Sequence, residues 1–286
     1  MMTTTARTPA FGFAAHARTA MSAVLGLGAL LVFCAAGPAK AENSAWDDIR
    51  AELYGAEREI HPAAGIIEME APYRALDAST VPITIVSRIP QSEDRYIRSL
   101  TLIVDENPAP IVGTFHFSPA NGIASISTRV RVNAYTSIRA IAETNDGALY
   151  MTAEYVKASG GCSAPASNDQ ELAMARMGKM KLKQLGAWRQ NELSEAQFMV
   201  SHPNYSGFQL DQVSQIWIPA HYVRSIELKL GEREIMRFDG DISISENPTF
   251  RFFVKPQGSD VLHAKVVDSE DKVFEQSWPI QIEPSS

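Results

Sequence analysis

The chain has 286 residues, of which 45% are hydrophobic and 21% charged, a globular composition rather than a disordered or fibrous one. Its formal net charge of −7 argues against a nucleic-acid-binding protein, because a phosphate backbone attracts basic surfaces. Two cysteines are too few for a disulfide scaffold or a cysteine-rich zinc site.

Residues 1–41 have the three parts of a secretory signal peptide. Arg7 and Arg18 give a basic beginning, an apolar run follows over 21–37, and small residues end at Ala41. The apolar run is at the short limit for a transmembrane anchor. We therefore expect cleavage near Ala41, export to the periplasm, and no membrane insertion of the mature chain.

Cleavage changes the charge and the cysteine content of the protein. It removes three basic residues and no acid, which takes the formal net charge from −7 to −10. Cys34 leaves with the signal peptide, so Cys162 is the single cysteine of the mature chain. In an oxidising compartment a lone cysteine is expected to be buried, used in chemistry, or paired with another molecule.

The mature chain begins with a predicted helix and continues as strands. Trp46, Ile49 and Leu53 recur at helical spacing within residues 42–55. Short apolar runs separated by Pro, Asn and Gly then predict strands at 81–86, 97–104, 111–117, 126–132, 137–143 and 149–156. The turn at 145–147 contains Asp-Gly between two such runs, which predicts a hairpin. This spacing is typical of an immunoglobulin-like sandwich.

A different pattern follows over residues 158–195. Small residues occupy 158–167, and a helix is predicted from about 168 to 185, with acids first and basic residues later. Strands are predicted again at 196–202, 222–230, 234–238, 249–255, 261–268 and 272–280. The sequence thus predicts an all-β protein with two immunoglobulin-like β-sandwich domains in tandem, 42–157 and 196–286, joined by a flexible Gly-Gly-Cys segment and a short helix.

Two short stretches repeat between the halves. The heptamer at 96–102 (YIRSLTL) matches 222–228 (YVRSIEL), and Glu-Asn-Pro occurs at both 106–108 and 246–248. The spacing between heptamer and tripeptide differs by fourteen residues. Two similar sandwiches are the simplest interpretation.

Cys162 carries the clearest chemical signal. Gly160 and Gly161 precede it, and Ser163 and Ala164 follow, so the residues on both sides of the thiol have small side chains or none. A thiolate is a good nucleophile and can exchange sulfur with a disulfide-type donor. These features predict a flexible arm that carries a group on Cys162.

The stretches around this cysteine resemble a known family. Residues 42–166 are similar to SoxY, the sulfur-carrying subunit of periplasmic thiosulfate oxidation, in 106–119, 127–150 and 156–162. Residues 196–280 are similar to its partner SoxZ, in 201–203, 218–231 and 245–255. The whole chain resembles the fused SoxYZ-like carriers associated with quinoprotein (PQQ) alcohol dehydrogenases.

The resemblance implies a carrier without enzymatic activity of its own. By position, Cys162 would be the carrier thiol and Gly160 and Gly161 its flexible flank, with a sulfur intermediate bound covalently and no other cofactor. Sox-type enzymes, or a quinoprotein dehydrogenase with c-type cytochromes, would be the partners. Ser163 and Ala164 replace the trailing glycines of the SoxY tail, and the arm is internal to the fused chain.

Other residues leave alternatives open. Met174, Met177 and Met180, spaced by three, can bind Cu(I) together with Cys162 or pack as ordinary apolar residues. His202 and His221 form an incomplete metal pair, so a structural or interface role is preferred and no metal site is predicted. A noncovalent adaptor for a quinoprotein dehydrogenase, with Cys162 dispensable, is the other alternative.

The basic residues of the connection also have two interpretations. They lie in the second half of the predicted helix, fourteen or more positions after Cys162, and are Arg176, Lys179, Lys181 and Lys183. If the connection folds back they would lower the pKa of the thiol. Otherwise they form a solvated face.

Overall fold

The computed structural model describes residues 45–55, 57–165, 170–258 and 261–283. The predicted signal peptide, with Cys34, lies outside these residues. Within the described ranges, no helix has the length and apolar character needed to cross a bilayer.

The amino-terminal half contains one α-helix and eight strands, in the order predicted from the apolar runs, with two short strands added before the first of them. The elements are α1 (Ala45–Tyr54), β1 (Ile60–Pro62), β2 (Ile67–Glu70), β3 (Val81–Ser87), β4 (Ile97–Val104), β5 (Ile111–Phe117), a 3-10 turn (Pro119–Asn121), β6 (Ile126–Val130), β7 (Thr136–Thr144) and β8 (Leu149–Val156). The predicted hairpin is confirmed, because β7 and β8 pair antiparallel across residues 145–148.

The carboxy-terminal half is also mainly β. Its elements are α2 (Gln170–Arg176), β9 (Met180–Leu185), β10 (Ser194–Val200), β11 (Gln209–Leu210), β12 (Trp217–Ile218), β13 (Val223–Leu230), β14 (Arg233–Gly240), β15 (Thr249–Val254), β16 (Val261–Asp268) and β17 (Val273–Pro279). Buried residues alternate with partly buried ones along β10 and mainly with exposed ones along β16, as expected for strands with one face on a core.

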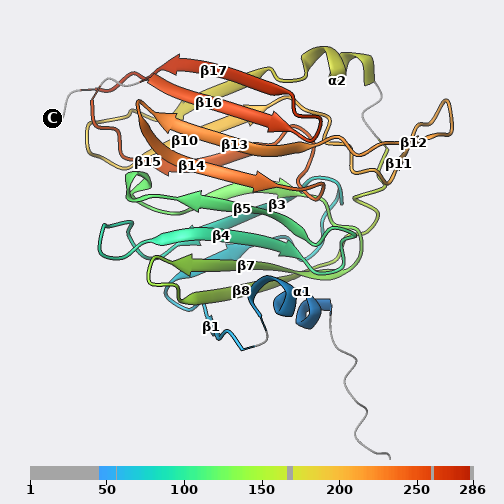
Figure 1. Ribbon diagram of the computed structural model, residues 1–286, viewed down its shortest axis with the longest axis horizontal. Coiled ribbons are helices and arrows are strands. Elements are labelled where there is room, and N and C mark those ends of the chain that lie inside the picture. Colours follow the sequence, from blue (N-terminus) through green and yellow to red (C-terminus); the bar gives the residue numbers. More distant parts are fainter. Residues whose placement is uncertain (1–44, 56, 166–169, 259–260, 284–286) are drawn as a thin grey trace, which may run out of the picture. The chain divides into compact units, whose positions relative to one another are not determined.

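The two halves share both of their main sheets. A nine-stranded sheet runs β1-β8-β7-β4-β5-β14-β13-β16-β17 (Figure 1). A six-stranded sheet runs β2-β3-β6-β15-β10-β9. The halves meet where β5 pairs with β14 and β6 pairs with β15, both antiparallel. The predicted pair of β-sandwiches is confirmed, and the structure adds that their strands are hydrogen-bonded edge to edge.

The strand order shows that the two heptamers of the sequence repeat lie on equivalent strands of the two halves. Outward from the junction, the order β5-β4-β7-β8 in one half corresponds to β14-β13-β16-β17 in the other. The heptamers lie on the equivalent strands β4 and β13, and each strand has a register shift at the same point, between Ile97 and Ser99 or between Val223 and Ser225. The Glu-Asn-Pro match is not equivalent, because Asn107 follows β4 whereas Asn247 precedes β15.

The helix predicted for 168–185 is wrong in its second half. α2 ends at Arg176, Gly178 has φ +80°, and residues 180–185 form strand β9, paired antiparallel with β10. Polar and apolar residues alternate over 179–183, a period of two that fits a strand once an edge is available to pair with. Met174 and Met180 therefore lie on different elements, and the three methionines do not form one helical face.

Helix α1 packs as its sequence pattern predicts. Trp46 and Ile49 are buried against Ile103, Ile141 and Leu149 on the nine-stranded sheet. Leu53 is partly buried against the same cluster. The apolar face of the helix thus covers the sheet of the amino-terminal half.

Aromatic rings cross the junction between the halves. Phe115 on β5 lies 4.7 Å from Phe238 on β14 and 5.1 Å from Phe250 on β15, measured between ring centroids. All three side chains are fully buried. The junction is therefore part of one continuous hydrophobic core.

We expect Phe115→Ala to lower the free energy of unfolding by about 3–5 kcal/mol, the range for deleting a buried aromatic side chain. Because Phe115 contacts both halves, the whole β region should still unfold in a single transition at lower denaturant concentration. Denaturant titrations followed by far-UV circular dichroism and tryptophan fluorescence measure this. The exposed Phe208→Ala is the control. Two separate transitions in the unmutated protein would contradict a shared core.

Candidate functional site: a buried cysteine between the two halves

Cys162 follows β8 in a tight turn that is bound to the loop after β6. The backbone N–H groups of Gly160 and Gly161 donate to the carbonyl oxygens of Asn133 and Val132, both at 2.9 Å. A Cβ atom on Gly161 would lie 2.1 Å from the carbonyl oxygen of Ala78. Glycine is therefore required at 161 for close backbone packing, and the segment expected to be a flexible flank is hydrogen-bonded at both residues.

The carboxy-terminal half closes over the cysteine. The hydroxyl of Ser206 donates to the carbonyl oxygen of Cys162, and Nε2 of Gln209 donates to the carbonyl oxygen of Ala164 at 2.9 Å. Cys162 has 0% of its surface exposed. We call residues 204–209 the clamp. The thiol thus sits in a site to which both halves contribute, and it is occluded at rest.

Arg131 joins the two sides of this site. Its side chain is buried, with Nη1 donating to the carbonyl oxygen of Gly161 at 3.0 Å and Nη2 to that of Asn204 at 3.1 Å. Nε of the same side chain has no hydrogen-bond partner among the residues described. One guanidinium therefore links the cysteine turn to the clamp.

Burial decides the protonation state of the thiol. Removal from water raises the pKa of Cys162 to about 11, although the positive charge of Arg131 acts in the opposite direction. Burial likewise lowers the pKa of Arg131, and the charge of Cys162 acts against that shift. At neutral pH the resting thiol is protonated, and therefore a poor nucleophile.

Three of the four basic residues that follow Cys162 in the segment between the halves line a cavity that does not include the cysteine. Arg176, Lys179 and Lys181 line a surface cavity of about 830 Å³ together with Arg129, on the side of α2 and β9. The cavity lining does not include Cys162. Arg131, which the sequence analysis did not single out, is the cation that acts on the thiol.

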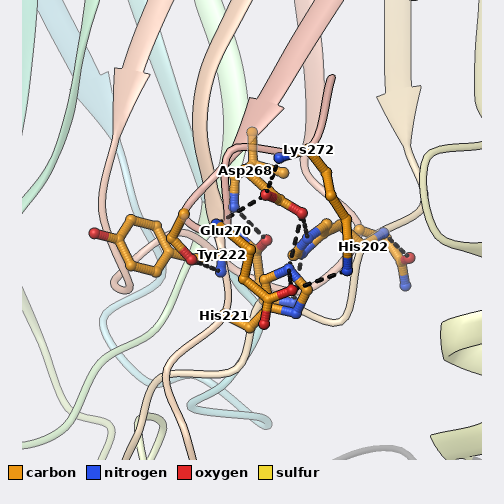
Figure 2. Close-up of polar contacts among 10 residues, drawn as sticks. His202, His221, Tyr222, Asp268, Glu270 and Lys272 are labelled. Atoms are coloured by element: carbon orange, nitrogen blue, oxygen red, sulfur yellow. Dashed lines mark hydrogen bonds and ion pairs between the residues drawn. The ribbon is translucent and has the colours of Figure 1, made fainter. Parts of the chain in front are cut away.

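A second polar cluster lies in the carboxy-terminal half, next to the clamp. His202 follows β10, His221 precedes β13, and Asp268 ends β16; Figure 2 shows the three side chains converging. Nε2 of His221 is 2.8 Å from Oδ2 of Asp268, and Nε2 of His202 is 3.7 Å from the same oxygen. All three residues are buried.

Electrostatics set the charge states of His202 and Asp268. Burial, and then the proximity of His221, lower the pKa of His202 to about 4, so its ring is neutral at physiological pH. Burial alone would raise the pKa of Asp268, but hydrogen bonds from His221 and from backbone N–H groups outweigh burial and lower it. Asp268 is therefore an ionised carboxylate between two imidazole rings.

His202 and His221 were candidates from the sequence, whereas Asp268 was not. Asp268 lies 47 residues after His221, and the two meet because β13 and β16 are neighbours, with Val223 opposite Asp268. An acid at the end of a predicted strand is a weak signal, since the pairing partner of that strand is set by the tertiary fold. The cluster also connects to the cysteine site, because His202 Nδ1 accepts the N–H of Asn204, whose carbonyl binds Arg131.

Two family models match consecutive parts of the chain. Residues 50–162 match the model of the sulfur oxidation protein SoxY, and residues 182–279 match that of the sulphur oxidation protein SoxZ. The SoxY match ends at Cys162. No curated protein matches the chain.

The solved structures that match part of the chain include a carrier and a reductase. The sulfur carrier protein SoxY from Chlorobium limicola f thiosulfatophilum is 24% identical, with 39% of this chain and 94% of that chain covered and a TM-score of 0.33. Superoxide reductase (neelaredoxin) E23A from Ignicoccus hospitalis is 17% identical, with 33% and 82% covered and a TM-score of 0.30.

The SoxY match precedes the SoxZ match along the chain, which is the order expected from the stretches that resemble these two families. SoxY and SoxZ are carrier and adaptor proteins of sulfur oxidation rather than catalysts. This chain belongs to the SoxYZ-like proteins, with a SoxY-like half and a SoxZ-like half fused in one polypeptide.

Proposed function

We propose that this protein is a periplasmic covalent carrier that holds a small sulfur-containing group on Cys162 and presents it to partner enzymes. The observation that supports this most directly is the position of Cys162. It is the last residue of the SoxY match, and the SoxZ-like half holds its carbonyl through Ser206. Such an arrangement gives the second half a role in controlling access to the thiol.

Loading fits thiol–disulfide-type exchange. The Cys162 thiolate attacks a sulfur atom that is bonded to a leaving thiolate, a new S–S bond forms, and the old bond breaks with its electron pair on the leaving group. The thiol proton passes to the leaving group or to solvent, so no external oxidant is needed. Release is the same exchange with a second thiolate as attacker.

Loading also requires the clamp to open. With Cys162 fully buried and its pKa near 11, neither the donor nor water reaches the sulfur in the resting state. A partner that displaces residues 204–209 would expose the thiol and restore its ordinary pKa at once. The partners we propose are periplasmic Sox-type enzymes or a quinoprotein dehydrogenase with its c-type cytochromes.

A noncovalent adaptor is the second candidate, and one surface feature favours it. Four large apolar side chains are exposed on and beside the β11–β12 hairpin, namely Phe208, Val213, Ile216 and Trp217. Exposed apolar groups gathered in this way are typical of contact surfaces. The adaptor would use this surface for a quinoprotein dehydrogenase, with Cys162 serving only as core.

Intact-mass spectrometry of the protein purified from its native host without reductant separates the two candidates. We expect a reducible adduct that maps to Cys162, and loss of the pathway function in Cys162→Ser. Ser163→Ala, which changes the neighbouring exposed hydroxyl, is the control and should keep both. An unmodified thiol under all growth conditions, with full function of Cys162→Ser, would establish the adaptor instead.

A further inference from the structure

We propose that His202, His221 and Asp268 form a binding site for a divalent first-row metal ion, with Zn²⁺ as the best-matched ion. The inference is independent of the carrier function proposed above. Two imidazole nitrogens and one carboxylate oxygen are a donor set that zinc binds in proteins. One potential donor atom of each residue, a ring nitrogen of each histidine and a carboxylate oxygen of Asp268, lies within 4.8 Å of the other two.

The distances between the donor atoms fit a tetrahedral ion. Ligand bonds of about 2.0–2.1 Å place neighbouring donors roughly 3.3 Å apart at the corners of a tetrahedron. Oδ2 of Asp268 is 2.8 Å from Nε2 of His221 and 3.7 Å from Nε2 of His202. Each of these two distances is therefore about half an ångström from the tetrahedral value, and the donor atoms of the two histidines lie within 4.8 Å of each other.

The carboxylate is held with one oxygen turned to the site. Oδ1 of Asp268 accepts the backbone N–H groups of Glu270 and Lys272, both at 2.9 Å. Oδ2 is left to face the two histidines (Figure 2). Orientation of a ligating carboxylate by hydrogen bonds to its other oxygen is usual in metal sites.

Glu270 is placed to be the fourth ligand. Its Oε2 lies 3.6 Å from Nε2 of His221, again close to a tetrahedral edge. The carboxylate is half-exposed and pairs with Nζ of Lys272 at 2.9 Å, a contact that it can exchange for the ion. Two carboxylates would neutralise a divalent cation, and the edge of the site at Glu270 gives the ion a path from solvent.

An unpartnered nitrogen points into this cluster. Nε2 of His202 has no hydrogen-bond partner among the described residues, although the side chain is 0% exposed. Buried polar atoms are nearly always satisfied, so one without a partner indicates a missing ligand. A cation among Nε2 of His202, Nε2 of His221 and Oδ2 of Asp268 supplies that ligand.

Metal binding requires Nε2 of both rings to lose its proton. Nδ1 of His202 accepts the N–H of Asn204 at 3.1 Å, so this ring, neutral at physiological pH, carries its proton on Nε2. Nε2 of His221 lies 2.8 Å from Oδ2 of the ionised Asp268, so it is the donor of that hydrogen bond. On binding, each Nε2 releases its proton, to solvent or to Nδ1 of its own ring, and donates its lone pair to the ion. A proton on Nδ1 of His202 would face the N–H of Asn204, so that N–H must turn away, and the hydrogen bonds to Asn204 and Asp268 are exchanged for three or four metal–ligand bonds.

The test uses the mature chain with Cys162→Ser, which removes the thiol as a competing ligand. After chelator treatment, titration with Zn²⁺ followed by calorimetry should show one equivalent bound. Co²⁺ should give the visible absorption of a four-coordinate ion with nitrogen and oxygen ligands. Asp268→Asn and His221→Gln should weaken Zn²⁺ binding at least a hundredfold. His263→Gln should leave it unchanged, since His263 is bonded to Ser277 outside the cluster.

A second measurement leaves the cluster residues unchanged, so its result does not depend on whether the cluster variants fold. In the Cys162→Ser chain, Zn²⁺ should shift the ring resonances of His202 and His221 and the amide resonance of Asn204, which loses its acceptor, and should leave those of His263 in place. Absence of saturable Zn²⁺ binding would overturn the proposal. So would equal affinity in Asp268→Asn and His263→Gln, or resonance shifts confined to other histidines.

Discussion

Cys162 in the folded protein is expected to react with iodoacetamide at least about a hundredfold more slowly at pH 7.5 than the same thiol in the unfolded chain. A pKa of about 11, against roughly 8.5 for a free cysteine, by itself lowers the thiolate fraction by about two orders of magnitude. Complete burial adds to this, because the reagent reaches the sulfur only when the clamp opens. Time-resolved mass spectrometry of the alkylated protein measures the rate.

Matched variants separate burial from sequence context. The double variant Cys162→Ser with Ser163→Cys moves the thiol one position, to a residue that is exposed, and should react at the rate of a free cysteine. Ser206→Ala combined with Gln209→Ala removes the two clamp side chains that donate to the turn and should speed alkylation of Cys162. If Cys162 reacts as fast as the cysteine at 163, the resting state is not occluded.

The pH dependence of stability has a defined sign at this residue. The pKa of Cys162 is higher in the folded than in the unfolded protein, so the folded protein retains the thiol proton more strongly. This contribution to stability is complete below the pKa of the unfolded thiol and is lost as the pH rises from about 9 to about 11. Cys162→Ser should lack that part of the alkaline decline.

The second large effect is expected for Arg131→Met. It removes the charged donor from the carbonyl oxygens of Gly161 and Asn204, and hydrogen bonds to charged groups contribute about 1.5–3 kcal/mol each. We expect the free energy of unfolding to fall by about 2–4 kcal/mol, because relief of the guanidinium's burial offsets part of the loss. Denaturant titration measures the change.

The same variant should also uncouple the clamp from the cysteine turn. Arg131 is the side chain that bonds both, so alkylation of Cys162 should accelerate under conditions where the protein remains folded. Arg129→Met is the matched control, since Arg129 lies on β6, two residues before Arg131, but is only partly buried and lines the cavity near α2. Equal alkylation rates in the two variants would show that Arg131 does not link the clamp to the turn.

Most strands were predictable because their cause is local. Apolar residues with a period of two, bounded by Pro, Asn and Gly, specify a strand wherever a neighbouring strand is available. The hairpin at 145–147 and the helix around Trp46 and Ile49 follow from equally local signals. The stretch 180–185 was assigned to a helix because its strand character depends on pairing with β10.

The functional residues also divide into those that local sequence identifies and those that only tertiary contacts identify. The sequence by itself determined that Cys162 is a candidate carrier, since a thiol flanked by Gly160 and Gly161 and its similarity to SoxY are properties of adjacent residues. Only the tertiary structure decided that the thiol is closed off. Ser206 and Gln209 lie 44 and 45 positions away from the groups they bind, and Arg131 lies 30 and 73 positions away from its two acceptors. No local pattern encodes those contacts.

The cluster around Asp268 depends on the same kind of distant contact. His202 and His221 are visible as histidines in the sequence, but the acid that completes the set arrives through the register of β13 and β16. Register is fixed by packing of whole sheets, and both halves contribute strands to the same two main sheets. Residue type and short-range spacing thus specify which groups are available for chemistry. Sheet pairing specifies which of these groups come into contact, because strands far apart in the sequence can pair as readily as neighbouring ones.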